Sequence, residues 1–175
     1  MNLLNDIEIL RAERSDVFRL QDIGKKTFSE TFSEYNSGEN MRAYLDDKFS
    51  EEELRSQLDA EFSQFYFAVL KKRIIGYLKI NFGNAQTELK DEKGLEIERI
   101  YVLKEFHGQG VGQLLYERAL TISKDSDVDF IWLGVWEKNP RAIHFYTKNG
   151  FVEFGKHVFR LGDDDQTDIM MKLAL

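Results

Sequence analysis

The stretch Arg99-Ile-Tyr-Val-Leu-Lys-Glu-Phe-His-Gly-Gln-Gly-Val-Gly112 decides how this chain folds. It begins as a β-rich strand, passes through a glycine-rich turn and enters a segment with helical apolar periodicity. Glycines at 108, 110 and 112 let the backbone approach a ligand, and the following helix N-terminus offers free N–H groups. The stretch therefore predicts an anion cradle suited to a pyrophosphate, although a tight turn without a ligand fits the glycines equally well.

The spacing of these glycines excludes two other phosphate-binding motifs. A dinucleotide fingerprint requires glycine where Gln113 stands, and it normally comes early in a βαβ unit. A P-loop requires Gly-Lys followed by Ser or Thr, which the stretch lacks.

A second informative segment runs Trp136-Glu-Lys-Asn-Pro-Arg-Ala-Ile-His-Phe-Tyr146-Thr-Lys-Asn-Gly-Phe151. Asn139 is a suitable helix cap, and the proline after it suits a first helical turn. Asn139, Ile143 and Tyr146 are spaced so that they share one helix face. Taken singly, Asn139 fits a cap, Tyr146 a packed aromatic and Lys148 a solvated charge.

The rest of the chain predicts a mixed α/β sandwich. Helices are expected after caps at Ser15, Asn40 and Ser50, the last with Glu53 in capping-box spacing. A turn is expected over 36–40 and an exposed loop over 83–94. Strands are expected over 7–10, 65–70, 74–82, 95–102, 130–136, 151–154, 158–161 and 169–173.

Length and composition indicate one domain over residues 1–175. Of the 175 residues 42% are hydrophobic, and no Pro/Gly/Ser-rich linker or repeat divides them. No stretch approaches the ~20 apolar residues that span a bilayer, so no membrane association is expected. The first ten residues lack the features of a signal peptide, so we expect a cytoplasmic protein.

Charge and residue usage restrict the chemistry. The formal net charge of −7 repels nucleic acid and attracts cations. The chain has no cysteine, which excludes an acyl-cysteine intermediate and thiolate metal sites. The three histidines have no metal-ligand spacing, so no metal is expected.

Together the two segments resemble the GNAT N-acetyltransferases. Gly110 and Gly112 match the family's acetyl-CoA loop R/Q-x-x-G-x-G/A, in which His107 replaces the Arg or Gln. The second segment matches the signature N-x-x-A-x-x-F-Y-x-K-x-G-F at every defined position. The resemblance covers nearly the whole chain. Further segments resemble PaiA-type acetyltransferases, which act on spermidine and spermine: 30–32, 36–45, 95–101, 131–139 and 162–168.

The resemblance implies an acyl-CoA N-acyltransferase fold, an α+β sandwich whose mixed, mostly antiparallel sheet has splayed central strands flanked by helices. It implies acetyl-CoA as cosubstrate. The residues expected to bind it are Ile100, Tyr101, Val102, His107, Gly108, Gln109, Gly110, Val111, Gly112, Asn139, Tyr146 and Lys148.

The resemblance also implies an acetyltransferase mechanism. Without a cysteine to carry the acetyl group, we expect direct attack by the acceptor amine in a ternary complex. Tyr146 is the expected general acid for the thiolate, and Glu98 the expected base acting through water. Because Glu96 shares a strand face with Glu98, either carboxylate could serve.

The expected acceptor is a small cationic amine, a polyamine such as spermidine or spermine. The residues expected to bind it are Glu30, Glu34, Glu98, Trp136 and Glu137. Other amine acceptors remain open, namely a peptide, a protein lysine or an aminoglycoside. A CoA-binding regulatory protein with little catalysis also remains open, as does a homodimer, whereas the negative charge disfavours a DNA-binding regulator.

Overall fold

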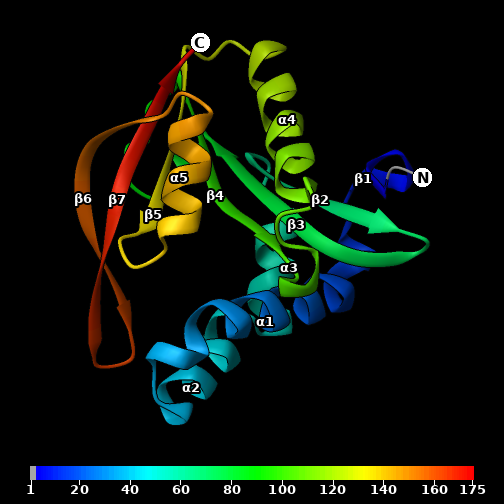
Figure 1. Ribbon diagram of the computed structural model, residues 1–175, viewed down its shortest axis with the longest axis vertical. Coiled ribbons are helices and arrows are strands. Elements are labelled where there is room, and N and C mark those ends of the chain that lie inside the picture. The colour runs from blue at the N-terminus through cyan, green and yellow to red at the C-terminus, as the bar shows by residue number, and fades with distance from the viewer. Residues whose placement is uncertain (1–2) are drawn as a thin grey trace.

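Seven strands lie in one mixed sheet in the order β1-β2-β3-β4-β5-β7-β6 (Figure 1). The computed structural model describes residues 3–175. The strands are β1 (Ile7–Arg11), β2 (Ser63–Leu70), β3 (Arg73–Phe82), β4 (Gly94–Val102), β5 (Phe130–Trp136), β6 (Val152–Leu161) and β7 (Asp164–Ala174). All neighbouring strands are antiparallel except β4 and β5. The expected α+β sandwich with a mostly antiparallel sheet is confirmed.

Five α-helices flank this sheet. They are α1 (Val17–Phe32), α2 (Gly38–Lys48), α3 (Glu51–Asp59), α4 (Val111–Lys124) and α5 (Pro140–Lys148). In Figure 1, α1, α2 and α3 gather at one end of the molecule, and α4 and α5 lie along the other. No helix in residues 3–175 has the length and apolarity that a membrane crossing requires.

The central strands are covered on both faces. Tyr77 of β3 faces α1, since its hydroxyl lies 3.7 Å from the position of a Cβ built on Gly24. Lys79 is on the same face, because its Nζ lies 3.0 Å from Gln57 of α3. Helix α4 also contacts β3 and β4. The unbroken run of buried residues in β3, from 75 to 81, reflects this two-sided cover.

The strands β4 and β5 separate soon after they begin to pair. Their parallel register covers only Gly94↔Phe130, Leu95↔Ile131 and Glu96↔Trp132. A β-bulge in β4 follows, because Ile97 pairs with Ile80 and Arg99 with Lys79. Glu98 is the extra residue of this bulge, which bends the strand away from β5. The expected splay of the central strands is therefore present.

Two predicted helix caps are wrong. Asp16 Oδ2 accepts a hydrogen bond from Glu13 N at 2.9 Å, so the chain turns into a 3₁₀ helix already at Arg14 and Ser15 lies inside it. The second helix starts before Asn40, because Ser37 is its N-cap and Ser37 Oγ accepts from Asn40 N at 3.1 Å.

The cap at Ser50 is confirmed, since its Oγ accepts a hydrogen bond from Glu53 N at 3.2 Å. The strands predicted over 151–154 and 158–161 are a single strand, β6. A bulge between Glu153 and Gly155 lets β6 stay paired with β7 across the polar residues that interrupt the apolar pattern.

Candidate active site

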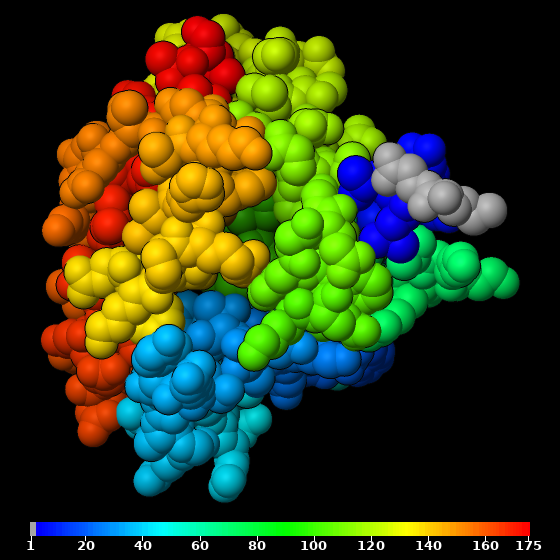
Figure 2. Space-filling view, viewed as in Figure 1, coloured from blue at the N-terminus to red at the C-terminus, as the bar shows by residue number. Residues whose placement is uncertain are grey.

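Two cavities meet where β4 and β5 separate. The first, which we call the turn cavity, has a volume of about 700 Å³ and lies between the glycine turn, β4 and α5. The second, which we call the inner cavity, has about 400 Å³ and lies between α1, the splayed strands and the β6–β7 hairpin. Six residues line both cavities: Thr31, Ile100, Tyr101, Asn139, Ala142 and Tyr146. Figure 2 shows the hollow between α5, the glycine turn and α1.

The glycine turn has the geometry of an anion cradle. Gly108 and Gly110 adopt φ values of 73° and 85°, which favour glycine, and Gly110 is the N-cap of α4. The first N–H groups of α4 have no acceptor within the helix, so they can bind a phosphate oxygen. A Cβ at Gly108 or Gly112 would meet no atom within 4 Å, so this space is open. The turn therefore fits the diphosphate of CoA.

The predicted cosubstrate residues gather around the turn cavity with one exception. Ile100, Tyr101, Val102, His107, Gly108, Gly110, Val111, Gly112, Asn139, Tyr146 and Lys148 line this cavity. Gln109 does not, and its side chain donates to Glu105 O at 2.8 Å. Cosubstrate binding by all twelve residues stays a prediction.

His107 and Arg141 add polar groups to the turn cavity. His107 Nε2 lies 2.7 Å from Val102 O, so this carbonyl already has a partner. Burial lowers the pKa of His107, which favours the neutral ring at neutral pH. Partial desolvation lowers the pKa of Arg141, a lining residue that the sequence analysis did not assign. Arg141 stands at an undefined position of the second segment's signature, so the signature could not identify it as a lining residue.

Tyr146 is a buried phenol at the junction of the two cavities. It lies on α5, whose N-cap Asn139 accepts a hydrogen bond from Ala142 N at 3.1 Å. Tyr146 is only 5% exposed, and its ring packs edge-on against Phe145 and Phe151. Burial raises the pKa of Tyr146, so the phenol keeps its proton at neutral pH and can donate it.

Glu98 is held by partners on three sides. Its Oε2 lies 2.5 Å from Lys79 Nζ and accepts from Asn81 Nδ2 at 2.7 Å, and its Oε1 lies 3.5 Å from Arg99. Burial alone would raise the pKa of Glu98, but Arg99, Lys79 and Asn81 together lower it. The carboxylate is therefore ionised and a weak proton acceptor.

Glu96 shares the face of Glu98, as the strand period predicted. Both carboxylates accept from Asn81 Nδ2, and Glu96 also accepts from the backbone N and the hydroxyl of Thr87. Burial raises the pKa of Glu96 against the opposing effect of these hydrogen bonds. Glu96 is only 3% exposed, so little of its carboxylate is open to the cavity.

Most carboxylates predicted to bind the acceptor lie elsewhere. Glu30, Glu34 and Glu137 are exposed and line neither cavity, and Glu30 Oε2 accepts from Lys104 N at 2.8 Å. Trp136 and Glu98 do line the inner cavity.

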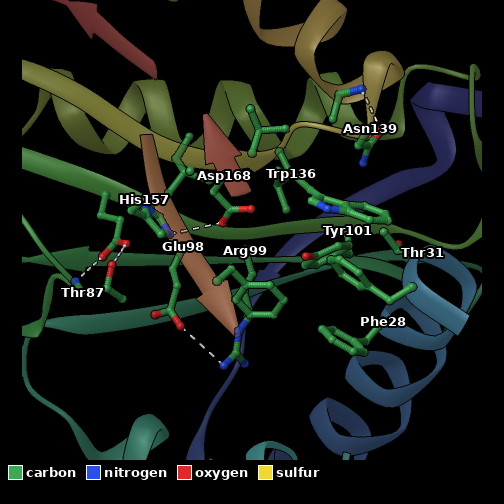
Figure 3. Close-up of a pocket in the computed structure, with 18 of the residues that line it drawn as sticks. Phe28, Thr31, Thr87, Glu98, Arg99, Tyr101, Trp136, Asn139, His157 and Asp168 are labelled. Carbon is green, nitrogen blue, oxygen red and sulfur yellow. Dashed lines mark hydrogen bonds and ion pairs between the residues drawn. The ribbon is translucent and has the colours of Figure 1, made fainter. Parts of the chain in front are cut away.

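The structure brings three unassigned residues into the inner cavity. His157 of β6 lies between two carboxylates, with Nδ1 3.4 Å from Glu88 and Nε2 3.4 Å from Asp168 of β7. Figure 3 shows His157 and Asp168 on one side of the cavity, with Asn139 and Thr31 on the other. Burial raises the pKa of Asp168. His157 opposes this shift, and Glu88 adds to it. The β6–β7 register brings His157 to Asp168, and a loop brings Glu88 to them, so spacing along the chain carries no signal for this cluster.

Comparison with known proteins agrees with this geometry. The Acetyltransferase (GNAT) family matches residues 25–151. An uncharacterized N-acetyltransferase of Lactobacillus delbrueckii subsp. lactis, named from the pepI 3' region, is 38% identical and covers 98% of this chain and 99% of its own. The crystal structure of PaiA N-acetyltransferase from Thermoplasma acidophilum in complex with coenzyme A has a TM-score of 0.80 at 22% identity, covering 97% and 99% of the two chains.

A more distant relative carries a specific name. The spermidine N(1)-acetyltransferase of Thermoplasma acidophilum is 24% identical over 95% of this chain and 96% of its own. The sheet with its splayed strands, the glycine turn and the family match lead to one conclusion: this chain belongs to the GNAT acetyltransferase family and is an acetyl-CoA-dependent N-acetyltransferase.

Proposed function

We propose that this enzyme transfers acetyl from acetyl-CoA to a primary amine of a small polyamine such as spermidine or spermine. The observation that carries the proposal is the inner cavity, which joins the turn cavity at Tyr146 and is lined by four carboxylates. These carboxylates belong to Glu88, Glu96, Glu98 and Asp168. Since a polyamine carries several ammonium groups, a cavity whose four carboxylates outnumber its two arginines, Arg99 and Arg160, complements it.

The walls of the inner cavity support the same acceptor. Phe28, Phe32, Tyr44, Trp136 and Phe159 line it, and their rings suit the methylene segments between ammonium groups. Phe32 and Phe159 both contact other rings of this set, with centroids 5.0 Å apart for Phe32–Trp136 and 5.8 Å for Tyr44–Phe159. The name of the Thermoplasma spermidine N(1)-acetyltransferase agrees with this acceptor class.

In the proposed mechanism this chain's residues position both substrates. The glycine turn binds the diphosphate of acetyl-CoA, which supplies the acetyl group as a thioester. The free edge of β4 at Ile100 and Tyr101 binds the pantetheine arm, and an N–H there polarises the carbonyl. Tyr146 donates a proton to the leaving sulfur. The amine attacks directly in a ternary complex, because the chain has no cysteine to carry the acetyl.

The base role predicted for Glu98 stays a prediction, and the contacts of this carboxylate with Lys79, Asn81 and Arg99 weigh against it. Roles for Glu30, Glu34 and Glu137 in acceptor binding also stay predictions, as do a homodimer, a cytoplasmic location and a single domain over residues 1–175.

A panel of amines tests the acceptor. Acetyl transfer is measured with spermidine, spermine, a lysine peptide and an aminoglycoside, each with acetyl-CoA. We expect the highest kcat/KM for the polyamines. A higher value for the peptide or the aminoglycoside would reject the polyamine proposal and leave the family's activity intact. CoA binding without acetylation of any amine would instead favour the regulatory protein.

A further inference from the structure

The acceptor's ammonium must lose a proton before its nitrogen can attack, and the inner cavity offers few free bases. Glu98 accepts from Lys79 and Asn81, and Glu96 accepts from Asn81 and Thr87. The partners of Glu98 lower its pKa, which makes it a weaker proton acceptor, and Glu96 is too buried to meet the acceptor openly. A base with fewer bound partners suits the step better.

His157 is such a group. Its two ring nitrogens approach Glu88 and Asp168 at 3.4 Å, and Nδ1 is buried with no hydrogen-bond partner among residues 3–175. An imidazole beside a carboxylate is a recurring general base, because the carboxylate orients the ring and stabilises the imidazolium that forms. Two carboxylates therefore flank this ring, one facing each nitrogen.

The sheet places the ring of His157 at the start of the splay. A Cβ built on Gly134 would lie only 2.9 Å from His157 Cε1 and 3.4 Å from Asp168 Oδ2. Gly134 is two residues beyond Trp132, the last residue of β5 that pairs with β4. Glu98 likewise lies two residues beyond Glu96, the last residue of β4 that pairs with β5. The ring thus lies over β5, across the splay from the β4 bulge.

We propose that His157 is the general base that deprotonates the acceptor amine, with Asp168 as the residue that positions its ring. This inference rests on the function proposed above. The ammonium gives one proton to the imidazole, and its freed lone pair forms the C–N bond to the acetyl carbonyl carbon. The thioester C–S bond breaks as Tyr146 protonates the sulfur. The acceptor nitrogen then gives a second proton to the phenolate of Tyr146, which restores the phenol. The imidazolium of His157 releases its proton to solvent.

The main test is the pH dependence of His157→Gln. The charged groups that line the same cavity are Glu88, Glu96, Glu98, Arg99, Arg160 and Asp168. We expect the variant to lose about 10²-fold in kcat and to lose the acidic limb of the kcat profile that the wild type shows. Lys156→Gln is the control, since Lys156 is exposed on the same strand and lines neither cavity.

Two further variants test the positioning. Asp168→Asn should lower kcat and shift the acidic limb of the kcat–pH profile. Its affinity for CoA, measured by calorimetry, should be unchanged. Gly134→Ala should lower kcat by displacing the ring, because the added methyl group would lie too close to Cε1. Thermal unfolding checks that each variant is folded.

The outcomes separate the inference from the function on which it rests. An active wild type with a His157→Gln variant of normal kcat and unchanged acidic limb would overturn the base assignment alone. If the acidic limb instead disappears in Glu98→Gln, Glu98 is the base. A wild type that acetylates no amine would overturn the proposed function, and the inference with it.

Discussion

Glu98 Oε2 lies 2.5 Å from Lys79 Nζ, and this ion pair joins β4 to β3 at the bulge where the sheet opens. Lys79 is only 5% exposed, and burial lowers its pKa although Glu98 opposes this shift. Asn81 completes the link by donating to Glu98 and Glu96. The pair therefore stabilises the irregular part of β4 that lines the inner cavity.

Removing one partner of this pair should destabilise the fold. Lys79→Met leaves the Glu98 carboxylate buried with one cation fewer, and we expect a loss of about 3–5 kcal/mol in the free energy of unfolding. Urea denaturation measures this loss. Lys93→Met is the matched control, because Lys93 pairs with Asp127 in solvent and its removal should change stability far less. Equal losses in both variants would contradict the structural role of the buried pair.

The same carboxylate should make stability fall in acid. The pKa of Glu98 is lower in the folded protein than its ordinary value of 4.5, so the unfolded chain binds its proton first. The stabilising contribution is complete above that ordinary value and is lost as the pH falls through the lower folded value. We expect Glu98→Gln to show a shallower decline in unfolding free energy below about pH 4.5 than the wild type. Parallel declines would show that other groups control acid unfolding.

Tyr146→Phe should separate catalysis from binding. The raised pKa of the buried phenol keeps it protonated, so the hydroxyl can serve as an acid and its ring as packing. We expect kcat to fall about 10²-fold or more while the Kd for CoA stays within about twofold. Steady-state kinetics and calorimetry measure the two quantities. An unchanged kcat would exclude the phenol as the acid.

Two glycines of the turn should respond differently to alanine. A methyl group at Gly112 meets no atom within 4 Å but enters the turn cavity, so we expect weaker CoA binding by about tenfold without loss of stability. Gly110 has a φ of 85°, so alanine there should cost about 1–2 kcal/mol of stability. Calorimetry and thermal unfolding of both variants check the contrast. A Gly112→Ala protein with normal CoA affinity would argue against a diphosphate at this turn.

Local sequence patterns predicted the parts of the site that lie within one segment. The glycine turn and the face shared by Asn139 and Tyr146 follow from spacing along the chain, because a turn and a helix fix the positions of near neighbours. The pairing of Ser50 with Glu53 is local in the same sense. These features could be predicted from the residues alone.

The remaining parts depend on contacts between distant segments. Asp168 and His157 meet through the β6–β7 register, and Glu88 reaches them from a loop that the sequence showed only as polar. The bulge at Glu98 sets Glu98 and Arg99 toward the same cavity, which strict alternation along a strand does not predict. Strand register and bulges arise from the pairing of distant segments, so residue spacing along the chain does not predict them.

The two cavities share a wall formed by Tyr101, Asn139 and Tyr146. This shared wall has a consequence for inhibitor design. A molecule that joins CoA through a short acyl linker to a diamine would fill both cavities along one continuous path. Tethering makes the second contact intramolecular, so its affinity should exceed that of either half by orders of magnitude, about 10²–10⁴-fold. Such a bisubstrate ligand would also report, through its best linker length, how far apart the sulfur and the accepting nitrogen sit during transfer.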